Sequence, residues 1–403
     1  MLEFILLRFA FLRVAFERIR SLVEKRARNH IVESTLFELG FPRDDFERIK
    51  VIVKENDPLI PTAYLKFDDI YSLEHYMCWK SGKLNVLLDN NIFTRLVYLA
   101  KGCEIRGNEE EIKAYRFCCA AMCFFILGKF NIEANVPLYE RASQNTHENA
   151  INDLYYFRVA DHVDASAYAK LALGRANRFS DAEIEDARKT IEGNLKNPEE
   201  SNFKKQLNDW KLSYVQLLKI VELSKHNDLE KTDQIRKFFD WVIHDFRSST
   251  GPLMFALLFL SPKKPGKMIK NINTKDFPTL IKNIKNAAWD LTYLAELRKR
   301  SKNQPDDTIW FFCSQDKLLQ RIERLLLLKK GYEIEAVIQN LIDEFWGKSN
   351  VQKVYKYYQM LSAPLKSETR REHNKNVLSQ TDKMITDLEA TIESMMPTQN
   401  PSI

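Results

Sequence analysis

The sequence has little glycine and proline. Only 11 of its 403 residues are Gly and 13 are Pro, whereas Gly alone averages about 7% of residues in ordinary proteins. A protein built mainly of strands and tight turns needs more of both. Leu, Lys, Glu and Ala are plentiful instead, which predicts a mainly helical protein with few strands.

Several common functional motifs are also missing. The six Cys residues form no pair of CxxC motifs and no Cys/His set at zinc spacing. No Gly-rich loop of the mononucleotide or dinucleotide type is present. These absences exclude the usual zinc-finger, NTPase and dinucleotide-binding patterns. They also predict free thiols in a reducing compartment, so we expect a cytoplasmic protein.

No apolar run reaches the ~20 residues that a membrane-spanning helix needs. The apolar N-terminal stretch 1–26 is interrupted by Arg8, Arg13, Arg18 and Arg20 and has no small-residue cleavage site. It predicts a helix packed on the rest of the protein, with a basic amphipathic helix on a membrane surface as the alternative. The net charge of +6 is compatible with a polyanionic partner.

Two segments have the composition of buried strands. They are 83–89, which ends in Asp89, and 308–313, which is rich in β-branched and aromatic residues. A shorter strand is expected at 130–135, and helices at 92–100, 109–129, 277–300 and 377–395. Strands followed by helices predict a small parallel-sheet α/β core embedded in a predominantly helical chain.

This organisation predicts four regions. Residues 1–80 form an N-terminal helical region, and 81–145 together with 277–330 form the α/β core. Residues 146–276 are a helical insertion, and 331–403 contain C-terminal helices and a loose tail.

Four carboxylates are candidate metal ligands: Asp89, Glu140, Asp290 and Asp316. Two of them directly follow predicted strands, where functional groups of α/β sheets gather. The alternatives are an Asx turn for Asp89 and a Lys or Arg partner for Asp290. Three or four converging carboxylates suit Mg²⁺ or Mn²⁺, which prefer oxygen ligands.

The order of these acids resembles that of the PIN-like nuclease domains, a fold of many bacterial toxin ribonucleases. The matching segments are LLDNN at 87–91, NIEANVPLYE at 131–140, AAWDLTYL at 287–294 and FFCSQDK at 311–317. The resemblance implies that Asp89, Glu140, Asp290 and Asp316 bind the metal and that Asn90 and Ser314 support them. Glu133 remains an alternative to Glu140 as the second acid.

A lysine-rich stretch precedes and enters the helix that contains Asp290. It is expected to guide RNA phosphates toward the acids, with a solvated helix face and loop as the alternative. Its members are Lys263, Lys264, Lys267, Lys270, Lys282 and Lys285.

The resemblance therefore implies a divalent-metal-dependent endoribonuclease that cleaves RNA phosphodiesters by a metal-activated water. It further implies a toxin or antiphage-defence effector, controlled by an inhibitor, a regulatory protein or homo-oligomerisation. Two alternatives remain, a DNA nuclease and a catalytically inactive scaffold that acts as a protein-interaction module.

Overall fold

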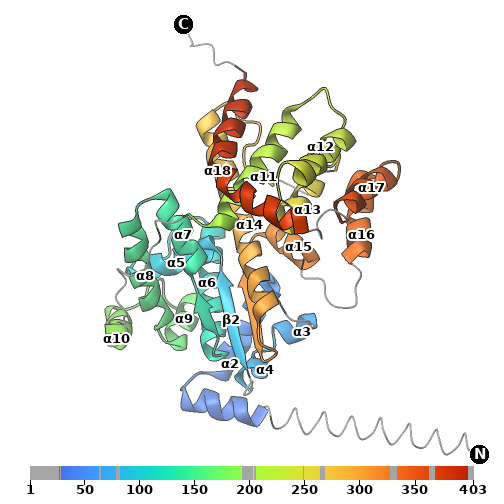
Figure 1. Cartoon of the computed structure of the whole chain (residues 1–403). Coiled ribbons are helices and arrows are strands. Elements are labelled where there is room, and N and C mark those ends of the chain that lie inside the picture. Colours follow the sequence, from blue (N-terminus) through green and yellow to red (C-terminus); the bar gives the residue numbers. More distant parts are fainter. Residues whose placement is uncertain are drawn as a thin grey trace, which may run out of the picture. The chain divides into compact units, whose positions relative to one another are not determined.

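Helices dominate the computed structural model, and four short strands form one sheet within the residues described. The described residues are 27–397 except 28, 63–64, 79–81, 193–202, 204–205, 248, 264–267, 327–333 and 363–367. They divide into two units (Figure 1). The sheet unit comprises 1–134, 151–200 and 304–313, and the helical unit comprises 135–150, 201–303 and 314–403. The regional boundaries predicted from the sequence stay a prediction.

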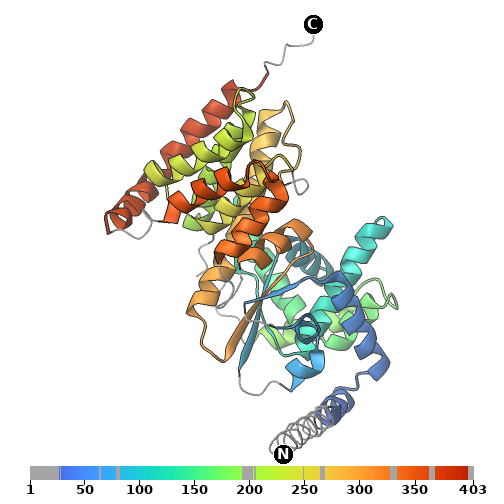
Figure 2. The same cartoon turned by 90° about the vertical axis from the view of Figure 1, so that its right-hand side faces the viewer.

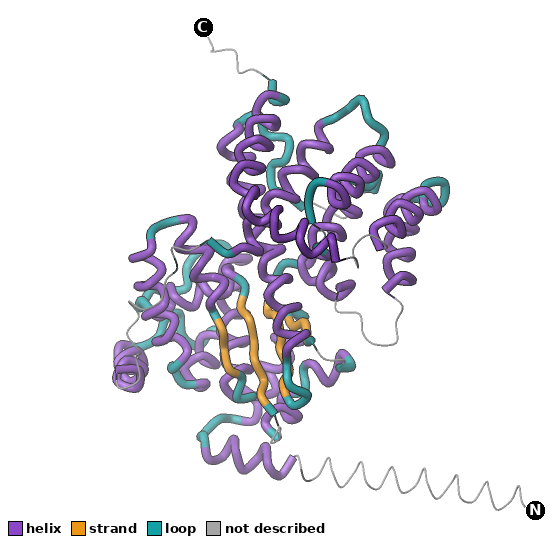
Figure 3. Tube along the Cα trace, viewed as in Figure 1, coloured by secondary structure: helices purple, strands orange, loops and turns teal. Residues whose placement is uncertain are grey.

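The sheet has the strand order β1-β4-β2-β3. These strands are β1 (Leu59–Pro61), β2 (Lys83–Leu88), β3 (Asn131–Glu133) and β4 (Thr308–Cys313). They lie side by side in Figure 3. β2 pairs in parallel with both β3 and β4, as predicted, whereas β1 pairs antiparallel with β4. The sheet is therefore mixed, and the prediction of a purely parallel sheet is wrong at β1.

The strand β1 lies in the region predicted to be helical. It has only three residues and ends in Pro61, so it is too short to show an alternating pattern in the sequence. Proline is tolerated there because β1 is an edge strand, where a missing N–H does not interrupt a ladder. The other three strands were predicted within one or two residues of their observed bounds.

The register of β2 is defined by its pairing with β3 on one side and with β4 on the other. On one side Asn85 pairs with Asn131, whose side-chain amide donates a hydrogen bond of 3.1 Å to the Asn85 side-chain oxygen. On the other side Leu88 pairs with Cys313. β2 and β4 therefore end in register at the same edge of the sheet.

The helices of the sheet unit pack mainly through α6. The bounds are α2 (Arg43–Asn56), α3 (Phe67–Ile70), α4 (Leu73–Met77), α5 (Asn90–Ala100), α6 (Glu109–Leu127), α9 (Ala165–Ala172) and α10 (Asp181–Glu192). The helix α8 (His147–Asp161) begins in the helical unit and belongs to the sheet unit from Ile151 onward. α6 contacts α2, α4, α5 and α9. It begins with a capping box, in which Asn108 and Glu111 satisfy each other's backbone N–H groups.

An aromatic cluster forms the core between these helices and the sheet. Tyr76 makes edge-to-face contacts with Phe124, Phe130 and Phe311, with ring centroids 5.1–6.1 Å apart. The Tyr76 hydroxyl donates to the Ile70 carbonyl at 2.9 Å, so its polar end is satisfied. The cluster attaches α4 and α6 to the middle of β4.

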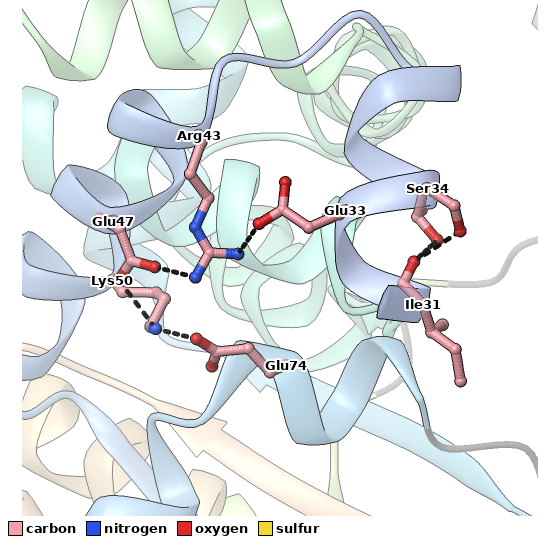
Figure 4. A network of polar contacts seen from close by, with 8 residues as sticks. Ile31, Glu33, Ser34, Arg43, Glu47, Lys50 and Glu74 are labelled. Atoms are coloured by element: carbon pink, nitrogen blue, oxygen red, sulfur yellow. Dashed lines mark hydrogen bonds and ion pairs between the residues drawn. The ribbon is translucent and has the colours of Figure 1, made fainter. Parts of the chain in front are cut away.

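Ion pairs connect α2 to its neighbours. Arg43 pairs with Glu33 at 3.2 Å and with Glu47 at 2.5 Å, and Lys50 pairs with Glu47 and Glu74 (Figure 4). The Arg43 pairs are largely exposed and contribute little stability. Lys50 and Glu74 each keep only 19% of their side-chain surface exposed, so this pair fixes α2 against α4 more firmly.

The helical unit is organised around α11. Its helices are α7 (Asn135–Gln144), α11 (Asn208–Lys225), α12 (Lys231–His244), α13 (Thr250–Phe259), α14 (Phe277–Asn303), α15 (Lys317–Leu326), α16 (Ile334–Trp346), α17 (Val351–Ser362) and α18 (Glu368–Ser394). α11 packs against both α14 and α18, and Figure 2 shows α11 beside α18. The predicted helices at 277–300 and 377–395 lie within α14 and α18, so both are confirmed.

A buried arginine caps the C-terminus of α12. The Arg370 guanidinium, in a residue only 7% exposed, donates hydrogen bonds to the carbonyls of Val242, Ile243 and Phe246. Carbonyls in the last turn of a helix have no partner within the helix. A cation at this end also interacts favourably with the helix dipole. Burial lowers the pKa of Arg370.

Replacing Arg370 with Met should lower the free energy of unfolding by about 3 kcal/mol, because buried carbonyls lose their donors. Urea unfolding of the full chain measures this change. The matched control is Lys375→Met on the exposed side of α18, for which we expect a change within about 0.5 kcal/mol. Equal stability of the two variants would contradict the capping role.

Along the part of the chain that the structure describes, no helix is long and apolar enough to cross a membrane. The predicted N-terminal helix at 1–26 lies outside the described residues, as do Lys264 and Lys267.

Candidate functional site

Asp89 is the first residue after β2 and the N-cap of α5. Its side-chain oxygen accepts a hydrogen bond of 2.9 Å from the backbone N–H of Ile92. Its own backbone N–H donates to the Cys313 carbonyl at 3.1 Å, which extends the pairing of β2 with β4 by one bond. Only 5% of Asp89 is exposed. The Asx-type cap weighed from the sequence is therefore present.

Two buried thiols lie close enough to Asp89 for its charge to affect them. Burial raises the pKa of the Cys118 thiol to about 12, and the negative charge of Asp89 adds to the rise while Arg95 opposes it. Burial also raises the pKa of Cys313 well above its ordinary value, again with a contribution from Asp89. The carboxylate thus lies in a low-dielectric environment, where a charge interacts strongly with any ligand.

Asp316 occupies the equivalent position after β4. Its side-chain oxygen accepts hydrogen bonds of 2.9 Å from the N–H groups of Leu318 and Leu319, which caps α15. The hydroxyl of the buried Ser314 accepts from the Asp316 N–H at 3.0 Å. Ser314 therefore shapes the turn that positions Asp316.

Glu140 lies on α7 and is 7% exposed. One of its carboxylate oxygens accepts from the Tyr293 hydroxyl at 2.9 Å, and the other accepts from Gln144 at 3.0 Å. Tyr293 is three residues beyond Asp290 on α14, and residues at this spacing share a helix face. The structure thus brings Glu140 against the turn of α14 that contains the half-buried Asp290.

Glu133, the alternative second acid, has a different setting. It is the last residue of β3, is partly exposed and pairs in register with Leu87 of β2. Glu133 belongs to the sheet unit and Glu140 to the helical unit. Both stay candidates for the second acid.

The four predicted ligands are divided between the units, with Asp89 in the sheet unit and the other three in the helical unit. Within the described residues, no three His, Cys, Asp or Glu side chains form an arrangement that would hold a metal ion. The four-carboxylate metal centre therefore stays a prediction.

The described lysines of the predicted basic stretch lie on the surface. Lys263, Lys270 and Lys282 are exposed. Lys285 lies over the ring of Tyr214, 5.6 Å from its centroid, and 4.0 Å from a Glu389 carboxylate oxygen. Lys285 thus has a packing role within the helical unit.

The Tyr293 hydroxyl, which donates to Glu140, was not predicted as a partner of that acid. The available signal was its spacing of three residues from Asp290 on a predicted helix. Comparison of the chain with protein-family models, curated proteins and solved structures gave no match. Functional assignment therefore rests on the residues themselves.

Two replacements of Asp89, with Asn and with Ala, test whether its side chain caps α5. Because Asn is as good an N-cap as Asp, Asp89→Asn should leave the free energy of unfolding within about 0.5 kcal/mol of the native value. Asp89→Ala should lower it by about 1 kcal/mol. Urea unfolding distinguishes the two variants. Asp316→Asn and Asp316→Ala should differ in the same way, because Asp316 caps α15. Equal loss in the Asn and Ala variants would argue against capping.

Proposed function

We propose that this protein is a divalent-metal-dependent endoribonuclease with a PIN-like core. The observation that carries the proposal is the order of the parallel strands. The chain passes from β2 to β3 on one side and later to β4 on the other side of β2. In open α/β sheets, ligands bind outside the carboxyl ends of the strands at such a switch point. Asp89 follows β2 there, and Ser314 and Asp316 follow β4.

The chemistry of the proposed ligands suits Mg²⁺ or Mn²⁺. Asp89, Glu140, Asp290 and Asp316 offer only carboxylate oxygens, the donors that hard divalent cations prefer. A carboxylate has two oxygens that accept several bonds, so the Ile92 N–H and the Tyr293 hydroxyl do not exhaust Asp89 or Glu140. The proposal requires that these four side chains meet in the working enzyme.

The protein groups in this proposal bind and orient. The helix caps of Asp89 and Asp316 hold their carboxylates in fixed positions, and Tyr293 does the same for Glu140. A bound Mg²⁺ or Mn²⁺ would supply a water of lowered pKa and positive charge next to a phosphodiester. Preorganised ligands are needed because small displacements cost much of the rate.

The substrate and setting in this proposal come from the resemblance to PIN-like nucleases. RNA is the expected substrate, and the exposed Lys263, Lys270 and Lys282 supply positive charge for its backbone. A cytoplasmic toxin or antiphage-defence role, restrained by an inhibitor, a regulatory protein or self-association, belongs to the same proposal.

The second candidate function is an inactive scaffold that binds other proteins. It is favoured by one observation: helix capping alone accounts for Asp89 and Asp316. The two functions differ in metal binding, because only the enzyme needs the carboxylates to bind a divalent cation.

The test is cleavage of labelled RNA and DNA by the full chain with Mn²⁺, with Mg²⁺ and with a chelator. RNA cleavage that needs the metal is expected. Asp89→Asn and Asp316→Asn should each lower the rate by at least about 100-fold, although both variants stay as stable as the native protein because Asn retains the cap.

The control for this test is Lys237→Gln, at an exposed position on α12, which should cleave at the native rate. Titration of Mn²⁺ gives a second measurement, in which Asp89→Asn and Glu140→Gln should each weaken binding. Activity that survives in the double variant of Asp89 and Asp316 overturns the nuclease proposal. Cleavage of DNA but not RNA assigns a DNA nuclease. The absence of both cleavage and metal binding favours the scaffold.

A further inference from the structure

Two adjoining cavities lie within the helical unit, between α7, α11 and α14. One has a volume of about 460 Å³ and the other about 260 Å³. They share the lining residues Tyr139, Gln206 and Leu207. Each is far larger than the ~30 Å³ that a water molecule occupies, and together they fall in the size range of small-molecule sites.

The smaller cavity has aromatic walls. Tyr139, Phe203, Trp210 and Trp289 line it together with His147. The rings of Trp210 and Trp289 lie 5.7 Å apart, and Tyr139 meets Phe203 edge to face at 5.2 Å. Aromatic walls of this kind hold a planar ring, such as a nucleobase, by stacking.

Two residues that line this cavity have a buried side-chain nitrogen without a hydrogen bond. Trp210 is only 7% exposed, and its indole N–H has no partner among the described residues. The Nδ1 atom of His147 is likewise buried and unpartnered within the described chain. A buried unpaired polar group is costly. A ligand with a hydrogen-bond acceptor on its ring would remove this cost for Trp210.

The larger cavity is suited to an anion. It is lined by Asn208 and Asp209, the first residues of α11, and no side chain caps this helix at its N-cap Leu207. The N-terminus of an 18-residue helix attracts negative charge through its N–H groups and dipole.

Two cations also line this larger cavity. Lys299 is paired with Asp209 and Glu296, two acids that also line the cavity, so its charge is more than balanced. Arg247 makes no ion pair with any residue that the structure describes, and its guanidinium remains available for a phosphate. The cation that would recognise an anion is therefore Arg247.

We propose that these cavities form a nucleotide-binding site. The base occupies the aromatic cavity and accepts a hydrogen bond from Trp210. The phosphate lies at the N-terminus of α11 beside Arg247. A hydrocarbon ligand would leave the Trp210 N–H unpaired, and a simple anion would leave the aromatic cavity empty. A planar heterocycle joined to a phosphate satisfies both cavities.

The nucleotide has two sources with the same chemistry, a free mononucleotide or one unit of an RNA chain. Tyr139 and Trp289 are the sequence neighbours of Glu140 and Asp290, so an RNA strand held here would pass close to two of the proposed metal ligands. The binding site itself does not depend on the nuclease proposal, because it is tested without metal.

The test is calorimetric titration of the full chain, in chelator, with adenosine monophosphate, adenosine, inorganic phosphate and a short oligoribonucleotide. Adenosine monophosphate should bind more tightly than adenosine or phosphate. Arg247→Gln should weaken its binding about tenfold and leave adenosine unchanged. Trp210→Phe, which keeps a smaller aromatic ring and removes the N–H, should weaken the binding of adenosine monophosphate and of adenosine about fivefold.

Lys237→Gln is the matched control, since it removes an exposed cation of α12 that lines neither cavity, and it should bind as the native chain does. Tighter binding of the oligoribonucleotide than of the mononucleotide identifies an RNA subsite, and the reverse identifies a free nucleotide. The proposal is overturned if neither the oligoribonucleotide nor the mononucleotide binds. It is also overturned if neither Arg247→Gln nor Trp210→Phe alters the binding. Equal affinity for phosphate and adenosine monophosphate overturns it as well.

Discussion

Backbone hydrogen bonds between β2 and β4 join two chain segments that are far apart in sequence, and the candidate site depends on them. Leu88 lies beside Cys313, and the Asp89 N–H continues the ladder to the Cys313 carbonyl. Because the strand period is two, a slip of one residue would turn every side chain of β2 to the opposite face. The Asn85–Asn131 hydrogen bond on the other edge opposes such a slip.

Helix capping gives the acids at the strand ends a structural function that coexists with the chemical one proposed for them. Each acid lies where a strand stops and a helix begins, so its carboxylate accepts N–H groups that the helix leaves unpaired. The same dipole stabilises the negative charge of these acids. Replacing such an Asp with Asn removes its charge but retains the cap, so any loss of activity reports on the chemical role. Replacing it with Ala also removes the cap, so a loss of activity could then come from lower stability.

Two buried side chains of the helical unit differ in how their N–H groups are paired. The two terminal nitrogens of the Arg370 guanidinium donate to carbonyls at the end of α12, so these bonds contribute to stability. The indole N–H of Trp210 has no partner within the described residues, although it lines an aromatic cavity. An unpaired buried group lowers stability, and natural proteins retain such costs mainly at functional sites.

Local patterns in the sequence determined the mainly helical composition, the strands at β2 and β4, and the placement of Asp89 and Asp316 just beyond them, because these features depend on neighbouring residues. The sequence also indicated an Asx turn as the alternative role of Asp89. The tertiary structure alone decided the antiparallel edge strand β1, the pairing of β2 with β4, the bond from Tyr293 to Glu140 and the cavities around Trp210. Each of these joins residues that are distant along the chain, and the packing of distant segments leaves no periodic signal in one sequence.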